Sequence, residues 1–266
     1  PMHFETDLLV FTPADVDLAR SPLRSTLRRD TYVLGAFNPG LTRLPNGNLL
    51  MMVRIAEALT KAVEGNHIHA IRWDRAHGYV ADAWDLAAVD VSDPRKFRLR
   101  GHPSKVMALT SLSWLLPVEL TADGTKIVRI HYEKAIAPQA DFQQYGVEDA
   151  RISVVAGRYF MTTCSVSAER HSTTLHTSDD GLNWTLQGII LDHQNKDMVF
   201  FEGLVDGKYH ALTRPLGDLY FAYPPGSEFE PGPSINLAQS PDGLHWKPVD
   251  TPLLRPRPAP QATATG

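Results

Sequence analysis

The heptapeptide Ser-Asp-Asp-Gly-Leu-Asn-Trp at residues 178–184 recurs as Ser-Pro-Asp-Gly-Leu-His-Trp at residues 240–246. A second short echo precedes each copy, Gly-Arg-Tyr-Phe at 157–160 and Gly-Lys-Tyr-His at 207–210. The chain therefore repeats a unit of short apolar runs separated by turns. Such units are typical of β-propeller blades, which are four-stranded sheets arranged around a central axis. The repeat predicts an all-β fold.

Other stretches of the chain also have the pattern of strands. Residues 49–54 and 127–132 are apolar runs that follow tight turns, and residues 67–73 alternate apolar and polar side chains. The only stretch with helical character is 15–30; Pro22 interrupts it, so it fits an extended arm equally well. In each heptapeptide the Asp, Gly and Trp suit a structural turn on the outer rim of a blade, not a catalytic site.

Composition excludes several classes of protein. The 266 residues carry 26 basic and 30 acidic side chains, with no basic block that would indicate a nucleic-acid partner. No apolar run approaches the ~20 residues of a membrane helix, and residues 1–10 lack the pattern of a signal peptide. Cys164, the single cysteine, is expected to be a buried core thiol. We therefore expect a cytoplasmic protein without a membrane partner.

Charged residues occur at two places where an apolar strand would begin. Gly-Val-Glu-Asp-Ala-Arg at 146–151 precedes the apolar residues 152–155, and Asn-Lys-Asp at 195–197 precedes the apolar residues 198–201. Either cluster alone would be interpreted as a solvated turn. Because both occupy the same point of consecutive units, we favour a functional site that contains carboxylates for proton transfer and cations that balance their charge.

At these residues the chain resembles glycoside hydrolase family 130, whose members are five-bladed propellers that act on β-mannosides. The matching motifs are Asn38-Pro39, Arg54, the segment 146–151, Lys196-Asp197, and the segments 207–209 and 213–215. Their order matches from about residue 38 to residue 246. The resemblance implies a five-bladed β-propeller and an enzyme that cleaves β-mannosidic bonds in short manno-oligosaccharides with inversion.

The resemblance also implies roles for individual residues. Asp149 corresponds to the proton donor, which in the phosphorylases of the family acts through a hydroxyl of the mannose. Lys196 corresponds to a phosphate-binding position, and Arg170 is a second candidate. The substrate-binding candidates are Asn38, Arg54, Glu148 and Asp197. Glu202 is a further candidate catalytic carboxylate, which would favour hydrolysis.

The reaction type stays open at this level, because Ala150 and Thr213 replace residues usual in the family. Phosphorolysis would produce mannose 1-phosphate, with inorganic phosphate as co-substrate; hydrolysis would produce mannose. No other cofactor is expected. His67 and His69 would share one face of a strand, which is a conceivable metal pair, but a polar strand face is the expected explanation and no metal is predicted.

The expected division of the chain is an N-terminal arm (1–30), a propeller (31–255) and a disordered tail (256–266). Members of the family continue through a further blade. The last blade is therefore either absent from this chain, or the ring is closed by the arm or by a second copy in a homo-oligomer. Two other functions are compatible with the motifs: a propeller that only binds a glycan or a protein, and an arabinan- or fructan-type glycosidase.

Overall fold

A computed structural model of the chain describes residues 8–191, 195–215 and 234–254. The predicted tail at 256–266 and the loop at 216–233 lie outside these ranges. The described part contains eighteen strands and five short 3-10 helices, and no α-helix. The predicted all-β fold is therefore confirmed. Within the described ranges no helix is long and apolar enough to cross a bilayer.

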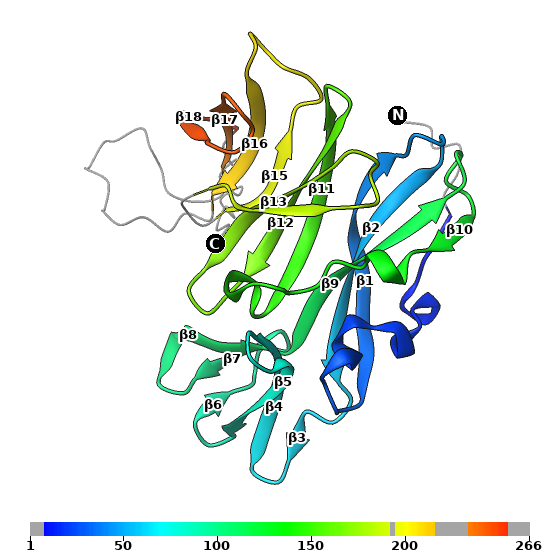
Figure 1. Ribbon diagram of the computed structural model, residues 1–266. Coiled ribbons are helices and arrows are strands. Elements are labelled where there is room, and N and C mark those ends of the chain that lie inside the picture. Colours follow the sequence, from blue (N-terminus) through cyan, green and yellow to red (C-terminus); the bar gives the residue numbers. More distant parts are fainter. Residues whose placement is uncertain (1–7, 192–194, 216–233, 255–266) are drawn as a thin grey trace, which may run out of the picture.

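Most strands form three four-stranded antiparallel units that follow one another along the chain (Figure 1). Unit one contains β1 (Thr31–Arg43), β2 (Leu49–Leu59), β9 (Ser111–Leu120) and β10 (Ile127–Ile130). Unit two contains β11 (Gly146–Val155), β12 (Arg158–Val166), β13 (His171–Ser178) and β14 (Thr185–Ile189). Unit three contains β15 (Asn195–Phe200), β16 (Tyr209–Pro215), β17 (Ile235–Ser240) and β18 (Lys247–Leu254).

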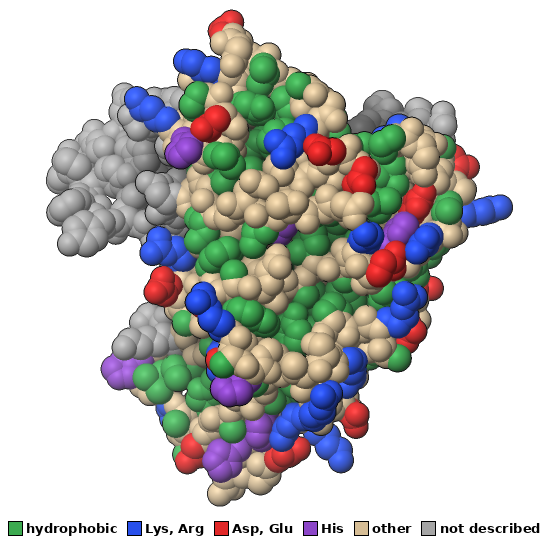
Figure 2. Space-filling model, in the orientation of Figure 1, with side chains coloured by type: hydrophobic (Ala, Val, Ile, Leu, Met, Phe, Trp, Pro, Cys, Tyr) green, Lys and Arg blue, Asp and Glu red, His purple; other side chains and the backbone are tan. Residues whose placement is uncertain are grey.

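Two small sheets are inserted between β2 and β9, and we call them the lobe. One contains β3 (Val63–Glu64), β4 (His67–Asp74) and β5 (Gly78–Asp85); the other contains β6 (Val89–Asp90), β7 (Lys96–Leu99) and β8 (His102–Leu109). The lobe lies below the units in Figure 1. On the face shown in Figure 2, basic and acidic side chains are interspersed and do not form a basic stripe.

The N-terminal stretch forms three 3-10 helices: η1 (Pro13–Asp15), η2 (Leu18–Arg20) and η3 (Pro22–Ser25). Two further 3-10 helices, η4 (Tyr132–Lys134) and η5 (Asp141–Gln143), lie between units one and two. Leu23 and Leu27 are buried in the core that unit one shares with the lobe. Pro22 was predicted to interrupt a helix over residues 15–30. In the structure it is instead the first residue of the short helix η3.

Apolar side chains hold neighbouring units together. One buried cluster joins Leu50 and Leu115 of unit one to Met161 of unit two, and another joins Leu175 of unit two to Met198 of unit three. A single parallel pair, Gly146 with Ser113, also links units one and two. The units are therefore packed against one another through continuous cores, as stacked sheets are.

The two heptapeptides form the same turn in units two and three. Asp180 accepts hydrogen bonds from the amides of Leu182 and Asn183 at 2.8 and 2.7 Å, and Asp242 does the same in its own turn at 2.9 and 2.8 Å. Trp184 contacts Tyr159 edge-on, and Trp246 contacts the ring of a phenylalanine of unit three. The predicted structural role of these turns is confirmed.

Candidate active site

Three strands carry the same local irregularity, one in each unit. Asn38 in β1, Asp149 in β11 and Asp197 in β15 have φ values of 48°, 54° and 56°. Each lies at a register shift, where the strand bulges away from its partner. Asn and Asp tolerate this left-handed conformation better than other non-glycine residues, and a bulge redirects the side chain that it carries. The acids thus lie within strands, whereas the sequence had placed them just before the strands.

A close approach of the backbones brings two of these bulges together. A Cβ atom at Gly40, two residues after Asn38, would lie 2.8 Å from the carbonyl oxygen of Ala150. No side chain fits there, so glycine at this position allows β1 and β11 to come into contact. The contact places Asn38 beside Asp149.

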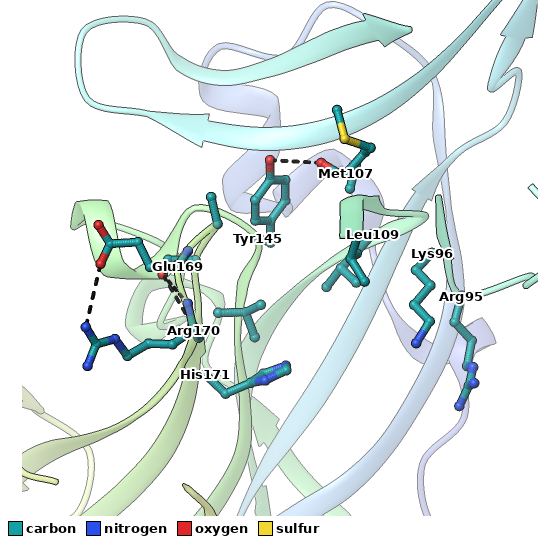
Figure 3. A pocket seen from close by; sticks show the side chains of 13 residues that line it. Arg95, Lys96, Met107, Leu109, Tyr145, Glu169, Arg170 and His171 are labelled. Atoms are coloured by element: carbon teal, nitrogen blue, oxygen red, sulfur yellow. Dashed lines mark hydrogen bonds and ion pairs between the residues drawn. The ribbon is translucent and has the colours of Figure 1, made fainter. Parts of the chain in front are cut away.

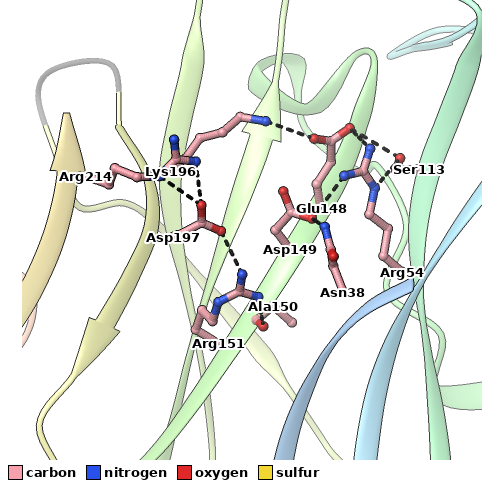
Figure 4. Close-up of polar contacts among 10 residues, drawn as sticks. All are labelled: Asn38, Arg54, Ser113, Glu148, Asp149, Ala150, Arg151, Lys196, Asp197 and Arg214. Atoms are coloured by element: carbon pink, nitrogen blue, oxygen red, sulfur yellow. Dashed lines mark hydrogen bonds and ion pairs between the residues drawn. The ribbon is translucent and has the colours of Figure 1, made fainter. Parts of the chain in front are cut away.

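The Asp149 carboxylate is held through one oxygen atom (Figure 4). Its Oδ1 accepts hydrogen bonds from Nδ2 of Asn38 and from a guanidinium nitrogen of Arg54, both at 3.0 Å. Among the residues that the structure describes, no hydrogen bond is made to Oδ2. The carboxylate is therefore fixed in orientation while one oxygen stays open to a substrate.

Glu148 uses both of its oxygens to connect all three units. Oε1 accepts hydrogen bonds from Arg54 at 2.7 Å and from the hydroxyl of Ser113 at 3.3 Å. Oε2 lies 3.3 Å from Nζ of Lys196, which belongs to unit three. Arg54 also donates from Nε to Ser113 at 3.0 Å, so its guanidinium is held by three different partners.

Asp197 is enclosed by two arginines. Its Oδ1 accepts a hydrogen bond from Arg151 of unit two at 2.9 Å, and its Oδ2 accepts two from Arg214 of unit three at 3.1 and 2.5 Å. Both oxygens of Asp197 are thus occupied, as both oxygens of Glu148 are. Asp149 is the one carboxylate of this cluster with an oxygen that accepts no hydrogen bond from a described residue.

Glu148 and Asp149 are the buried part of the cluster, and the cluster as a whole carries more positive than negative charge. The side chains of Glu148 and Asp149 are 5% and 8% exposed. Burial raises the pKa of Asp149, but Arg54, Asn38 and Lys196 outweigh burial and hold that pKa below its usual value. Burial opposes the charge of Lys196, yet Cys164 and the two carboxylates outweigh it and raise the pKa of Lys196. Four cations thus face three carboxylates: Arg54, Arg151, Lys196 and Arg214 against Glu148, Asp149 and Asp197.

The structure places two of the predicted site residues outside this cluster. Glu202 is exposed in the turn after β15, and no hydrogen bond or ion pair links it to the cluster within the described ranges. Arg170 lies between β12 and β13, where its nearest acidic partner is Glu169 at 4.0 Å. The roles of both residues remain predictions. Across the described ranges, no group of three or more His, Cys, Asp and Glu side chains is placed to hold a metal ion.

Sequence reasoning assigned no role to two members of the cluster, Ser113 and Arg214. Arg214 lies in a motif that carried the family resemblance, and in β16 it pairs with Lys196 of β15. That pairing could have been inferred once β15 and β16 were recognised as neighbours. Ser113 lies in an apolar strand of unit one, and nothing in its sequence context indicates a site. The predicted burial of Cys164 is confirmed, since the residue is 2% exposed.

The chain is similar to a known protein family and to several known proteins. Residues 110–262, more than half of the chain, match the family model described as "beta-1,4-mannooligosaccharide phosphorylase". The chain is 29% identical over 199 residues to a beta-1,2-mannobiose phosphorylase from Listeria innocua serovar 6a, covering 69% of this chain and 51% of that protein. It is 27% identical over 107 residues to a 1,2-beta-oligomannan phosphorylase from a Thermoanaerobacter species, covering 39% of this chain and 36% of that protein.

A solved structure extends the similarity to the fold. The Listeria innocua beta-1,2-mannobiose phosphorylase in complex with beta-1,2-mannobiose superposes with a TM-score of 0.75 at 27% identity, covering 93% of this chain and 64% of that one. In the sequence comparison, the chain spans about half the length of its Listeria relative. With the family model matched over units two and three and the last two strands of unit one, β9 and β10, the chain belongs to glycoside hydrolase family 130.

Proposed function

We propose that this protein is a phosphorylase that cleaves β-mannosidic bonds in short manno-oligosaccharides and releases mannose 1-phosphate. The observation that carries the proposal is the asymmetry of the three carboxylates. Glu148 and Asp197 have both oxygens bound by cations or a hydroxyl, whereas Asp149 keeps Oδ2 open. Asp149 is thus the group able to carry and deliver a proton, and the ammonium group of Lys196, which donates to Glu148 and has three N–H donors, can also bind an anion.

In the proposed reaction, a phosphate oxygen attacks the anomeric carbon of mannose from the face opposite the leaving group. The glycosidic C–O bond breaks, and the departing sugar oxygen receives the proton of Asp149, directly or through a mannose hydroxyl. The proton that phosphate carried replaces the one that Asp149 gave up. The configuration at the anomeric carbon inverts, as for any single displacement.

Because the pKa of Asp149 is low in the site without phosphate, bound phosphate would also be needed to protonate this carboxylate. In the unliganded site Arg54 and Lys196 favour the ionised carboxylate, which cannot donate a proton. A phosphate dianion bound beside these cations would offset their charge and raise the pKa of Asp149. Proton donation is therefore expected only when phosphate is present, which protects the substrate from hydrolysis in its absence.

Hydrolysis is less well supported by this arrangement. An inverting hydrolase needs a second carboxylate as a base, with room for a water molecule. In the cluster Glu148 and Asp197 are both paired with cations, and Glu202 is exposed away from it.

We further propose that the three units, which lie within residues 31–255, are blades of a five-bladed propeller. The three bulged strands lie at corresponding positions of their units, as innermost strands around one axis would. β1 also exposes Tyr32, Leu34, Phe37 and Leu41, which is a surface suited to a further blade. Light scattering of the purified chain would test whether a second copy covers this surface.

We also propose that residues 1–30 form an N-terminal arm and that the protein acts in the cytoplasm.

The test is incubation with β-1,2-mannobiose and with β-1,4-manno-oligosaccharides, with and without inorganic phosphate, followed by measurement of mannose 1-phosphate and free mannose. Mannose 1-phosphate is expected, and free mannose at equal rates in both conditions would show hydrolysis instead. Asp149→Asn should reduce turnover by about 10²–10⁴-fold. Asp206→Asn is the matched control, because Asp206 is also left-handed, with φ 50°, but is exposed outside the cluster.

A further inference from the structure

A cavity that none of the cluster residues lines lies elsewhere in the described part of the protein. The cavity has a volume of about 780 Å³ and lies between the lobe and unit two. β7 and β8 form one wall, and Tyr145 with the segment between β12 and β13 forms the other (Figure 3). Its size suits a sugar ring that carries a substituent.

Strand register places this cavity on the catalytic face of unit two. Glu148 pairs with Cys164, Gly146 with Val166, and Val166 with His171. Side chains two residues apart on a strand share a face, so Val166 and His171, which line the cavity, lie on the same face as Glu148. Two residues correspond to roughly 7 Å along a strand. The wall of the cavity at Val166 therefore begins about the length of one sugar ring along β12 from Cys164, the strand partner of Glu148.

The lining combines apolar walls with positive charge. Met107, Leu109 and Tyr145 form apolar surface, and the Tyr145 hydroxyl is already directed to the backbone oxygen of Met107 at 3.4 Å. In Figure 3 the ends of Arg95 and Lys96 lie across the cavity from the His171 ring.

The basic groups are only partly neutralised. Arg95 is paired with Asp93 at 3.1 Å, whereas Nζ of Lys96 lies 3.9 Å from the nearest carboxylate oxygen of that residue. The one acid in the lining, Glu169, is 82% exposed and faces Arg170. A neutral sugar would need no such excess of positive charge, whereas an anionic one would be held by it.

We propose that this cavity is a subsite for the sugar on the far side of the cleaved bond, and that it selects a sugar bearing a phosphate ester or a carboxylate. The inference rests on the proposed phosphorolysis, since it concerns the second product of that reaction. Lys96 would bind the anionic group, with Arg95 and His171 at its sides, and Tyr145 would provide the apolar wall for the ring.

The reverse reaction provides the test, with mannose 1-phosphate as donor and mannose, mannose 6-phosphate or glucuronic acid as acceptor. The anionic acceptors should have the higher kcat/KM, and the two of them distinguish a phosphate ester from a carboxylate. Lys96→Gln should lower the ratio of anionic to neutral kcat/KM roughly tenfold. Lys208→Gln is the control, because Lys208 is exposed and does not line the cavity. Equal use of all three acceptors, or a preference unchanged by Lys96→Gln, would overturn the proposal.

Binding measured by calorimetry separates this proposal from the proposed function. Mannose 6-phosphate and glucuronic acid should bind the wild-type protein more tightly than mannose, and Lys96→Gln should remove that difference. If no acceptor is turned over but this pattern is seen, the phosphorylase assignment fails and the anionic subsite stands. If the acceptors are turned over but neither binding nor kinetics favours the anionic ones, the phosphorylase assignment stands and the anionic subsite fails.

Discussion

Replacing His176 should remove one contribution to the loss of stability of this protein between pH 6.5 and pH 4. His176 lies in β13 and is 1% exposed, and neither ring nitrogen has a hydrogen-bond partner among the described residues. Burial lowers its pKa from 6.5 to about 4, so the folded protein holds this ring neutral. The unfolded chain has no such constraint and binds a proton below pH 6.5.

The magnitude follows from this difference in pKa. Between pH 6.5 and pH 4 the unfolded state binds the proton and the folded state does not, so acid favours unfolding across that window. At pH 5 the loss from this one residue is about 2 kcal/mol, rising to about 3 kcal/mol below pH 4. Above pH 7 both states are neutral at this position, and the contribution disappears.

Urea unfolding of wild type and His176→Leu at pH 7.5 and pH 5 provides the measurement. The variant should lose about 2 kcal/mol less than wild type between the two pH values. It should not be the less stable protein at pH 7.5, since an apolar side chain of similar size replaces two unsatisfied polar atoms. His102→Leu, at an exposed position, should behave as wild type. Equal acid losses in wild type and His176→Leu would refute the reasoning.

Three further predictions concern packing and the site. Gly157→Ala should destabilise the fold by about 1 kcal/mol and Gly181→Ala by more, since φ is 79° and 78° at the two positions but only at Gly181 would a Cβ atom meet a close neighbour, Cδ2 of Leu44 at 2.8 Å, which has to shift; equal urea midpoints would contradict this. Cys164 should resist a thiol reagent at pH 8 and react in urea, because burial raises its pKa to about 12; rapid labelling of the native protein would contradict it. Phe37→Ala should lower kcat/KM about 2–5-fold and Phe37→Tyr should not, because the ring lies 4.9 Å from the Arg54 guanidinium; unchanged kinetics in Phe37→Ala would count against that contact.

Much of the fold could be predicted because it is encoded locally. The predicted strand at 67–73 lies in β4, and the one at 49–54 lies in β2, because alternation and turn residues determine strands over short distances. The repeat correctly indicated units two and three. Unit one lacks the heptapeptide and is interrupted by the lobe, so its four strands could not be recognised from the repeat.

The site was predictable where charge conflicts with an apolar strand. Glu148 and Asp149 could be identified for that reason, and the structure brings both into the cluster with Arg54 and Lys196. The contribution of Ser113 depends on how two units pack together, which no local pattern encodes. Glu202 is only five residues from Asp197 in the sequence, yet the side chain of Glu202 lies outside the cluster. Proximity in sequence was therefore not sufficient to identify a member of the site.

Because Arg54, Glu148 and Lys196 come from three separate units, the reactive centre exists only while those units remain docked. If the packing between any two of these units loosened, the charged groups would separate before the strands unfolded. Activity should consequently be lost before the units unfold. A small anion that binds to cations of different units should stabilise the packing between those units.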